Sequence, residues 1–178
     1  MDKIEGTKTQ KNLQDAFAGE SQARNKYTYF ASVARKAGYN QIANFFLETA
    51  GNEKEHAELW FKELGLLGET TQNLEAAAAG EMYENTQMYP TMAKEAHEEG
   101  FTRIAKLFEG VTKIEKTHED RYRALKANIE QDKVFEKDKD IQWICSNCGH
   151  QYFGEKAPKK CPVCDHPKAY FEMYVRAY

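Results

Sequence analysis

Glutamate and histidine residues recur in this chain in a pattern that suits the binding of two metal ions. The pattern occurs twice, each time as a lone glutamate followed by a Glu-x-x-His motif: Glu20 with Glu53 and His56, then Glu81 with Glu115 and His118. The lone glutamate precedes its motif by 33 residues in the first copy and by 34 in the second. Four-helix bundles that hold two metal ions take one Glu from each of two helices and one Glu-x-x-His from each of the other two. The repetition therefore predicts one shared site rather than chance matches.

The residue types in the pattern favour iron or manganese. Residues three apart lie on one face of a helix, so Glu53 and His56 can approach the same ions from one side. Carboxylate oxygens and imidazole nitrogens are ligands that suit these metals. Glu84 adds a carboxylate three residues after Glu81, where the first half of the chain has Ala23 or Gln22. With this extra glutamate the carboxylates nearly neutralise two cations, so the site can lose and gain electrons without a large buried charge.

Two tyrosines are candidates for supporting the ligands. Tyr27 and Tyr89 follow Glu20 and Glu81 by about two helical turns, which allows their hydroxyls to bond to a ligand carboxylate. Taken alone, each tyrosine is more often part of a bundle core. Other glutamates of this region are interpreted as solvated charges on helix surfaces, among them Glu55, Glu58, Glu95, Glu98 and Glu119.

Apolar residues at helical spacing predict four long helices that carry these side chains. The predicted helices run from the Thr7-x-x-Gln10 capping box to Ala37, from Gln41 to Leu64, from Asn73 to Glu99, and from Thr102 to about Ile129. Gly38 is typical of a residue that ends a helix, and Asn40 is typical of the N-cap of the next one. Pro90 is expected to kink the third helix.

The two halves of the helical region are copies of each other. His56 aligns with His118 at an offset of 62 residues, whereas Glu20 aligns with Glu81 at an offset of 61. One extra residue therefore lies between Glu81 and Tyr89. A helix that keeps its register around one inserted residue usually forms a π-helical turn. We predict an i→i+5 hydrogen bond within this segment.

Composition limits the class of protein. Charged residues make up 30% of the chain and the mean hydropathy is −0.80, which suits amphipathic helices with one wet face. A net charge of −3 is too small to predict binding to nucleic acid or to a membrane surface. The first residues lack the apolar core of a signal peptide, and no run of about 18 apolar residues predicts a membrane span. We expect a cytoplasmic protein with no nucleic-acid or membrane partner.

All four cysteines lie near the C-terminus, as Cys145, Cys148, Cys161 and Cys164. Two close pairs in a chain with no other cysteine predict metal ligands rather than disulfides. A tetrahedral four-thiolate site suits zinc or iron. The dense alternating charge of residues 130–140 predicts a solvated linker. We therefore predict a helical domain at residues 1–138 and a small, metal-stabilised domain at 139–178.

With both parts in view, the whole chain resembles the rubrerythrins, which join a ferritin-like diiron domain to a short rubredoxin-like domain. The resemblance includes the segment Ala-Phe-Ala-Gly-Glu-Ser-Gln-Ala-Arg-Asn (16–25) and the tripeptide Met-Tyr-Pro (88–90). It implies a mainly α fold, a ferritin-like four-helix bundle with a small C-terminal rubredoxin-like β/knuckle domain. It implies two iron ions held by Glu20, Glu53, Glu81, Glu84, Glu115 and His118, and a third iron ion held by the four cysteines. One iron of the family exchanges a glutamate ligand for a histidine on reduction, and these positions match Glu84 and His56.

The resemblance also implies a function. Rubrerythrins reduce hydrogen peroxide to water in oxidative-stress defence, with electrons from NADH that arrive through a redox donor protein such as rubredoxin or its reductase. The thiolate iron would pass these electrons to the diiron site, and Tyr27 and Tyr89 would position groups near the ligands. The family forms head-to-tail homodimers, so we expect electron transfer between subunits.

Other functions share parts of the pattern. A ferritin-like ferroxidase or iron-handling protein has the bundle but needs no reductant domain. A zinc ribbon attached to a helical bundle would suggest a scaffold or interaction role. The residues alone leave zinc and iron open at the thiolate site, and leave peroxide and dioxygen open as the oxidant.

Overall fold

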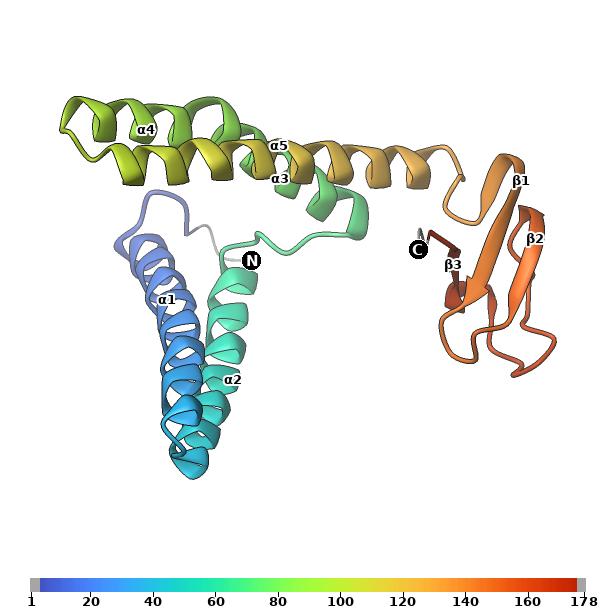
Figure 1. Ribbon diagram of the computed structural model, residues 1–178, viewed down its shortest axis with the longest axis horizontal. Helices are drawn as coiled ribbons and strands as arrows, with labels where there is room; N and C mark the ends of the chain where they lie inside the picture. The colour runs from blue at the N-terminus through green and yellow to red at the C-terminus, as the bar shows by residue number, and fades with distance from the viewer. Residues whose placement is uncertain (1–3, 176–178) are drawn as a thin grey trace. The chain divides into compact units, whose positions relative to one another are not determined.

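The computed structural model describes residues 4–175, which form long helices followed by a small sheet (Figure 1). The elements are α1 (Lys8–Lys36), α2 (Asn40–Glu63), α3 (Thr70–Tyr83), a π-helical turn (Glu84–Met88), α4 (Tyr89–Glu98), α5 (Thr102–Glu130), β1 (Glu136–Cys145), β2 (Gln151–Lys156), a 3₁₀ turn (Lys168–Tyr170) and β3 (Phe171–Met173). The chain divides into two compact units, one ending at Glu69 and one beginning at Thr70. No helix of the described residues is long and apolar enough to cross a membrane.

The first unit is a hairpin of α1 and α2, and its start is capped as predicted. The Thr7 hydroxyl accepts a hydrogen bond from the Gln10 backbone N–H at 3.1 Å. The Gln10 side-chain oxygen in turn accepts one from the Gly6 backbone N–H at 2.8 Å. The first bond satisfies a backbone donor of the first helical turn, and the second satisfies the N–H of the residue before the N-cap.

A tight reversal joins α1 to α2. Gly38 has φ +85°, a left-handed conformation that glycine adopts at little cost, and the Tyr39 N–H bonds to the Ala34 carbonyl at 2.9 Å. The predicted helix-ending role of Gly38 is therefore confirmed. The prediction that Asn40 is an N-cap is wrong, because the reversal leaves Tyr39 as the N-cap and Asn40 is already the first residue of α2.

Alanines line the interior of both helical hairpins, where their small side chains let the helix backbones approach closely. In the first hairpin Ala31, Ala34 and Ala43 form a buried cluster against Phe46. The second hairpin, built from α3, α4 and α5, buries Ala78, Ala93, Ala96 and Ala105.

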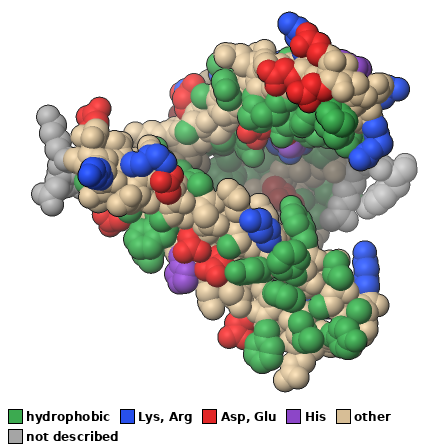
Figure 2. Space-filling view, turned by 90° about the vertical axis from the view of Figure 1, so that its left-hand side faces the viewer, with side chains coloured by type: hydrophobic (Ala, Val, Ile, Leu, Met, Phe, Trp, Pro, Cys, Tyr) green, Lys and Arg blue, Asp and Glu red, His purple; other side chains and the backbone are tan. Residues whose placement is uncertain are grey.

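Large apolar side chains remain exposed on each hairpin, including Phe30 and Phe45 on the first and Ile104 and Ile114 on the second. Figure 2 shows hydrophobic side chains gathered in patches on the surface. The helices of each hairpin thus leave part of the hairpin's apolar surface exposed.

The π-helical turn lies where the sequence comparison places its extra residue. The Tyr89 N–H donates to the Glu84 carbonyl, an i→i+5 hydrogen bond, which confirms the prediction. The single third helix predicted from Asn73 to Glu99 is instead α3, the π turn and α4, and it begins three residues earlier, at Thr70. Pro90 lies in the first turn of α4, a position that does not require its missing N–H.

The C-terminal residues form a three-stranded antiparallel sheet in the order β2-β1-β3. Its core is the fully buried Trp143 together with Cys145, Ala157, Cys161 and Phe171. The indole nitrogen of Trp143 donates to the Gly154 carbonyl at 2.8 Å, so this buried polar atom is satisfied.

Strand β1 begins inside the charged segment that the sequence predicted to be a linker. Glu136 pairs with Lys156 of β2, both in the strand register and through a salt bridge of 3.0 Å. The linker interpretation is therefore wrong from Glu136 onward, because cross-strand pairing orders residues that composition alone marks as solvated. The division into domains at residue 138 stays a prediction.

Candidate metal centres

The first predicted set of ligands comes together within the first hairpin. Glu20 lies on α1, and Glu53 and His56 lie one turn apart on α2. One potential ligand atom from each lies within 4.8 Å of those of the other two. His56 Nδ1 lies 2.9 Å from a Glu53 carboxylate oxygen and 3.7 Å from a Glu20 oxygen. Two carboxylates and an imidazole thus converge on one small volume.

The second predicted set repeats this geometry within the second hairpin. Glu81 lies on α3, and Glu115 and His118 lie on α5. His118 Nδ1 lies 2.8 Å from a Glu115 oxygen and 3.5 Å from a Glu81 oxygen, and the three ligand atoms again fall within 4.8 Å. We call these two groups the N-half-site and the C-half-site. The duplication in sequence is thus a duplication of three-dimensional arrangement, and each half-site lies within its own hairpin.

Electrostatics in the C-half-site favour the arrival of a cation. Burial raises the pKa of Glu81, and a hydrogen bond to Glu115 together with the negative charges of Glu115 and Glu84 raises it further, against the opposing effect of His118. A divalent ion bound here would relieve the repulsion that Glu81 experiences from the neighbouring carboxylates.

Glu84 lies near the C-half-site without belonging to the group of three ligand atoms. It is half-buried and opens the π turn, and its charge contributes to the raised pKa of both Glu81 and Tyr89. Its assignment as a metal ligand stays a prediction, as do those of the other glutamates and histidines.

The two tyrosines lie in aromatic contacts inside their hairpins. The Tyr27 ring is 6.2 Å from Phe46 and 6.3 Å from Phe30, and the Tyr89 ring is 6.0 Å from Phe108. Burial raises the pKa of Tyr89, and the charges of the nearby carboxylates Glu84, Glu115 and Glu81 raise it further. Tyr89 therefore keeps its hydroxyl proton beside the carboxylates and can donate a hydrogen bond there.

Sequence reasoning missed a buried polar cluster in the second hairpin. The interpretation of Glu119 as a solvated charge is wrong, because its residue is only 6% exposed and it accepts hydrogen bonds from Asn85 and Arg123. A signal for its burial exists in the repeat. The position of Glu119 aligns with Ala57, a small apolar residue that is itself buried between α1 and α2.

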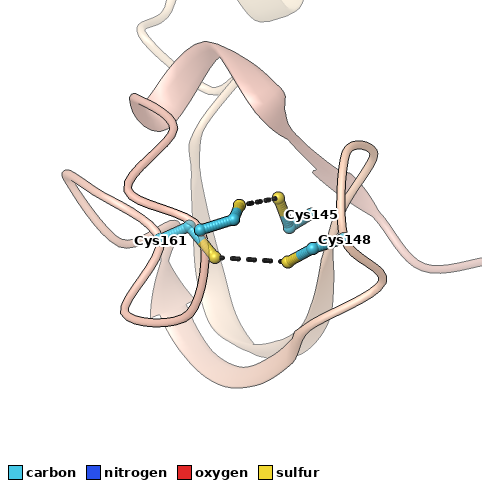
Figure 3. Close-up of side chains that lie close together, drawn as sticks. Cys145, Cys148 and Cys161 are labelled. Atoms are coloured by element: carbon cyan, nitrogen blue, oxygen red, sulfur yellow. Dashed lines mark hydrogen bonds between the residues drawn. The ribbon is translucent and has the colours of Figure 1, made fainter.

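The four cysteines converge as predicted, and their geometry fits a tetrahedral ion. Cys145 Sγ lies 3.7 Å from Cys164 Sγ, and Cys148 Sγ lies 3.6 Å from Cys161 Sγ, with all four sulfurs within 4.8 Å of one another. Four thiolates at about 2.3 Å from a common ion would be about 3.8 Å apart. A disulfide would instead require about 2.05 Å. In Figure 3 the sulfurs of Cys145, Cys148 and Cys161 point into one shared space.

Backbone N–H groups support the thiolates. A hydrogen bond from the His166 backbone N–H lowers the pKa of Cys164 to about 6. The backbone N–H of His150 acts in the same direction on Cys148, but the neighbouring thiols outweigh it and raise the pKa of Cys148 to about 12. One negative charge therefore resides readily on the cluster, while further charges need a cation to balance them. Such a donor set fits iron or zinc.

Comparison with known proteins finds a family for each of the two parts of the chain that contain these centres. Residues 11–126 match the family described as Rubrerythrin, and residues 143–172 match the family described as Rubrerythrin, rubredoxin-like domain. The chain belongs to the rubrerythrin family. A Rubrerythrin of Porphyromonas gingivalis is 52% identical, over 95% of this chain and 91% of that protein. Rubrerythrin-1 of Clostridium acetobutylicum is 50% identical over the full length of both chains.

Membership of the rubrerythrin family confirms the predicted fold class, a mainly α ferritin-like domain followed by a small rubredoxin-like β domain. It also makes the chain a metal-binding oxidoreductase with iron as the expected metal. Both centres contain the ligand types that iron needs, carboxylate and imidazole in the helices and four thiols in the sheet domain.

Proposed function

We propose that this rubrerythrin-family protein is a non-haem diiron peroxidase that reduces hydrogen peroxide to water with electrons passed through a rubredoxin-type iron centre. The observation that carries the proposal is the presence, in one chain, of two matching carboxylate–histidine half-sites and a tetrahedral four-thiol cluster. The half-sites suit oxygen chemistry on a pair of ions, and the thiol cluster suits one-electron transfer.

The two half-sites would together hold two iron ions in a four-helix bundle. The exposed apolar surface of each hairpin supports this assembly, since a hairpin buries that surface only against another apolar face. The ligands would be Glu20, Glu53, Glu81, Glu84, Glu115 and His118, with His56 replacing Glu84 on one ion when the pair is reduced. The position of Glu84 at a π turn supports its part in this exchange, because π turns concentrate at functional sites.

Reduction of one peroxide molecule to two water molecules takes up two electrons and two protons. The iron pair, when bound, supplies the two electrons. The protein would orient the ligands: Tyr89 retains its hydroxyl proton beside Glu81, Glu84 and Glu115 and would donate a hydrogen bond to a ligand carboxylate. Tyr27 would do the same in the first hairpin, where Phe30 and Phe46 fix its ring.

The sheet domain would return electrons to the helices one at a time. We place the electron source in NADH, delivered through a redox donor protein such as rubredoxin or its reductase, and the reaction in the cytosol. The presence of four free cysteines at metal-binding distances supports a reducing compartment. We further propose a head-to-tail homodimer, in which the thiolate iron of one subunit serves the iron pair of its partner.

Rapid mixing of the fully reduced, iron-loaded protein with hydrogen peroxide or with air-saturated buffer tests the activity. The proposal expects peroxide to oxidise the protein far faster than air, followed by the appearance of the red colour of the oxidised thiolate iron. A Glu84→Ala variant, which gives this position the residue of the first half, should slow the reaction, whereas Glu95→Ala on the surface of α4 should not. Faster oxidation by air, with retention of mineralised iron, would favour the ferroxidase alternative.

Mixed dimers test the route between subunits. One chain would carry Glu115→Ala to disable its iron pair, and the other Cys164→Ser to disable its thiolate iron. Transfer between subunits expects the mixed dimer to regain activity that neither parent homodimer has. Activity no higher than that of the parents excludes this route.

A further inference from the structure

A buried polar cluster adjoins the π turn in the second hairpin. Asn85 and Glu119 are the two buried polar side chains of residues 4–175, at 9% and 6% exposure. Asn85 is the second residue of the π turn, and Glu119 lies on α5 directly after the half-site residue His118. Burial of a carboxylate is unfavourable unless it is hydrogen-bonded and paired with a cation. The partners of Glu119 therefore have to offset the cost of burying its charge.

Hydrogen bonds connect the cluster to the turn from two sides. The Asn85 side-chain amide donates to the Glu119 carboxylate at 3.0 Å and to the backbone carbonyl of Glu81 at 2.6 Å. Arg123 Nε donates to the other carboxylate oxygen of Glu119 at 2.8 Å, and its Nη2 reaches Met82 Sδ at 3.4 Å. Helix α5 thus holds both the π turn and the last turn of α3 that precedes it.

The first hairpin, which has no π turn, lacks these polar residues. Its equivalents of Glu119 and Arg123 are Ala57 and Phe61 at an offset of 62 residues. The Phe61 ring packs against Phe17 with centroids 5.1 Å apart, so an apolar contact stands where the second hairpin has the Arg123 ion pair. The cluster and the π turn therefore occur together in one half of the repeat and are both absent from the described residues of the other.

The π turn decides which side chains share a helix face. Glu20 and Tyr27 are seven residues apart, close to two α-helical turns, whereas Glu81 and Tyr89 are eight apart. The wide turn absorbs the extra residue. If it relaxed to an α-helical ladder, residues after it would rotate by about 100° relative to Glu81, and Glu81 and Tyr89 could no longer face the same site.

We propose that Asn85, Glu119 and Arg123 form a polar clamp that holds the π turn and thereby positions Glu84 and Tyr89 relative to Glu81. The three are positioning residues, since none belongs to the half-site group. The role toward Glu84 rests on the proposed function of the half-sites, whereas the role in holding the turn does not.

Amide hydrogen exchange in the metal-free, full-length protein tests the clamp directly. Glu119→Ala installs the residue that the first hairpin uses at this position, and Asn85→Ala removes the bridging amide. Both variants should accelerate exchange at residues 84–89 by about tenfold or more while leaving α1 and α2 unchanged. Glu75→Gln is the matched control, because the Glu75–Lys126 ion pair of 2.9 Å also joins α3 to α5 but lies away from the turn.

A conservative substitution separates the clamp from a general loss of stability. Glu119→Gln keeps the side chain's size and one of its two acceptor oxygens, so exchange in the turn should accelerate less than in Glu119→Ala. Wild-type exchange rates at residues 84–89 in both Glu119→Ala and Asn85→Ala would overturn the clamp. Acceleration spread evenly over α3, α4 and α5 would also overturn it, and if Glu119→Ala unfolds the hairpin, Asn85→Ala decides alone.

Cobalt absorption tests the effect on the metal ligands. The clamp predicts that Glu119→Ala changes the d–d bands of Co²⁺ bound to the carboxylate–histidine residues. The thiolate charge-transfer bands of Glu119→Ala should match the wild type, and so should both sets of bands in Glu75→Gln. Unchanged d–d bands would overturn the positioning of Glu84. A wild-type protein that binds Co²⁺ only at the thiols would instead contradict the proposed function. The hydrogen-exchange rates of the metal-free variants would then still test whether the clamp holds the π turn.

Discussion

Replacing Trp143 by alanine should sharply weaken metal binding by the sheet domain. The Trp143 side chain is 0% exposed, contributes to the core beside Cys145 and Cys161, and donates a hydrogen bond to Gly154. Removing a buried Trp side chain destabilises a protein by about 3–5 kcal/mol, through lost burial and the cavity left behind. In a domain this small, few other contacts offset such a loss.

The loss of folding free energy appears as a loss of metal affinity. Metal binding is coupled to folding in small metal-stabilised domains, so the destabilisation passes into the apparent dissociation constant. At about 1.4 kcal/mol per tenfold, a loss of about 3–5 kcal/mol weakens binding by roughly two to more than three orders of magnitude. Co²⁺ titration of the reduced full-length chain, followed by thiolate charge-transfer absorption in competition with a chelator, measures this change.

An exposed aromatic of the same sheet provides the control. Phe153 on β2 is 63% exposed, so Phe153→Ala should change the dissociation constant by less than about threefold. If Trp143→Ala also binds within about threefold of wild type, the buried core does not support the thiol cluster and the coupling argument is wrong.

The thiol cluster, the buried Glu119 and the cap of α1 each give a further prediction. The pKa of Cys148 is raised to about 12 and that of Cys164 is lowered to about 6, so metal binding near pH 7 must displace at least the Cys148 proton. The apparent Co²⁺ affinity of the thiol cluster should therefore rise at least about tenfold per pH unit from pH 7 to 8, and a flat profile would contradict this. Hydrogen bonds from Arg123 and Asn85 lower the pKa of Glu119 below its ordinary 4.5. The ionised Glu119 therefore contributes its full share to the folding stability above pH 4.5, and this share is lost as pH falls through the lower folded pKa. In urea unfolding, the stability difference between wild type and Glu119→Gln should shrink below pH 4.5, and a constant difference would refute the assignment. Thr7→Ala should destabilise the start of α1 by about 1 kcal/mol, seen as faster exchange of the first-turn amides, while Thr28→Ala at a helix-interior position should leave those amides unchanged.

The duplicated pattern made much of the helical part predictable from sequence. Each hairpin brings its lone Glu beside its Glu-x-x-His. Helical spacing places the Glu and the His of the motif on one face, and the packing of the two helices adds the lone Glu. The offset change from 61 to 62 located the π turn, since an inserted residue must be absorbed where the alignment shifts.

Other features depend on tertiary contacts that sequence patterns do not encode. Glu119 looks like its solvated neighbours in local sequence, and apart from its alignment with Ala57 only packing against Asn85 and Arg123 distinguishes it. Residues from Glu136 onward are as charged as a linker, yet pairing with β2 orders them as a strand. In both cases long-range partners override local composition.

Mössbauer spectroscopy of the oxidised protein, reconstituted with ⁵⁷Fe, is the most direct measurement of whether the two half-sites make one centre. A shared centre predicts a pair of ferric ions coupled antiferromagnetically, with no magnetic splitting at low temperature, beside the distinct spectrum of the thiolate iron. It also predicts that Glu53→Ala, in the first hairpin alone, disrupts the coupled signal. Two magnetically isolated ferric ions, each lost separately when its own hairpin is altered, would contradict the account.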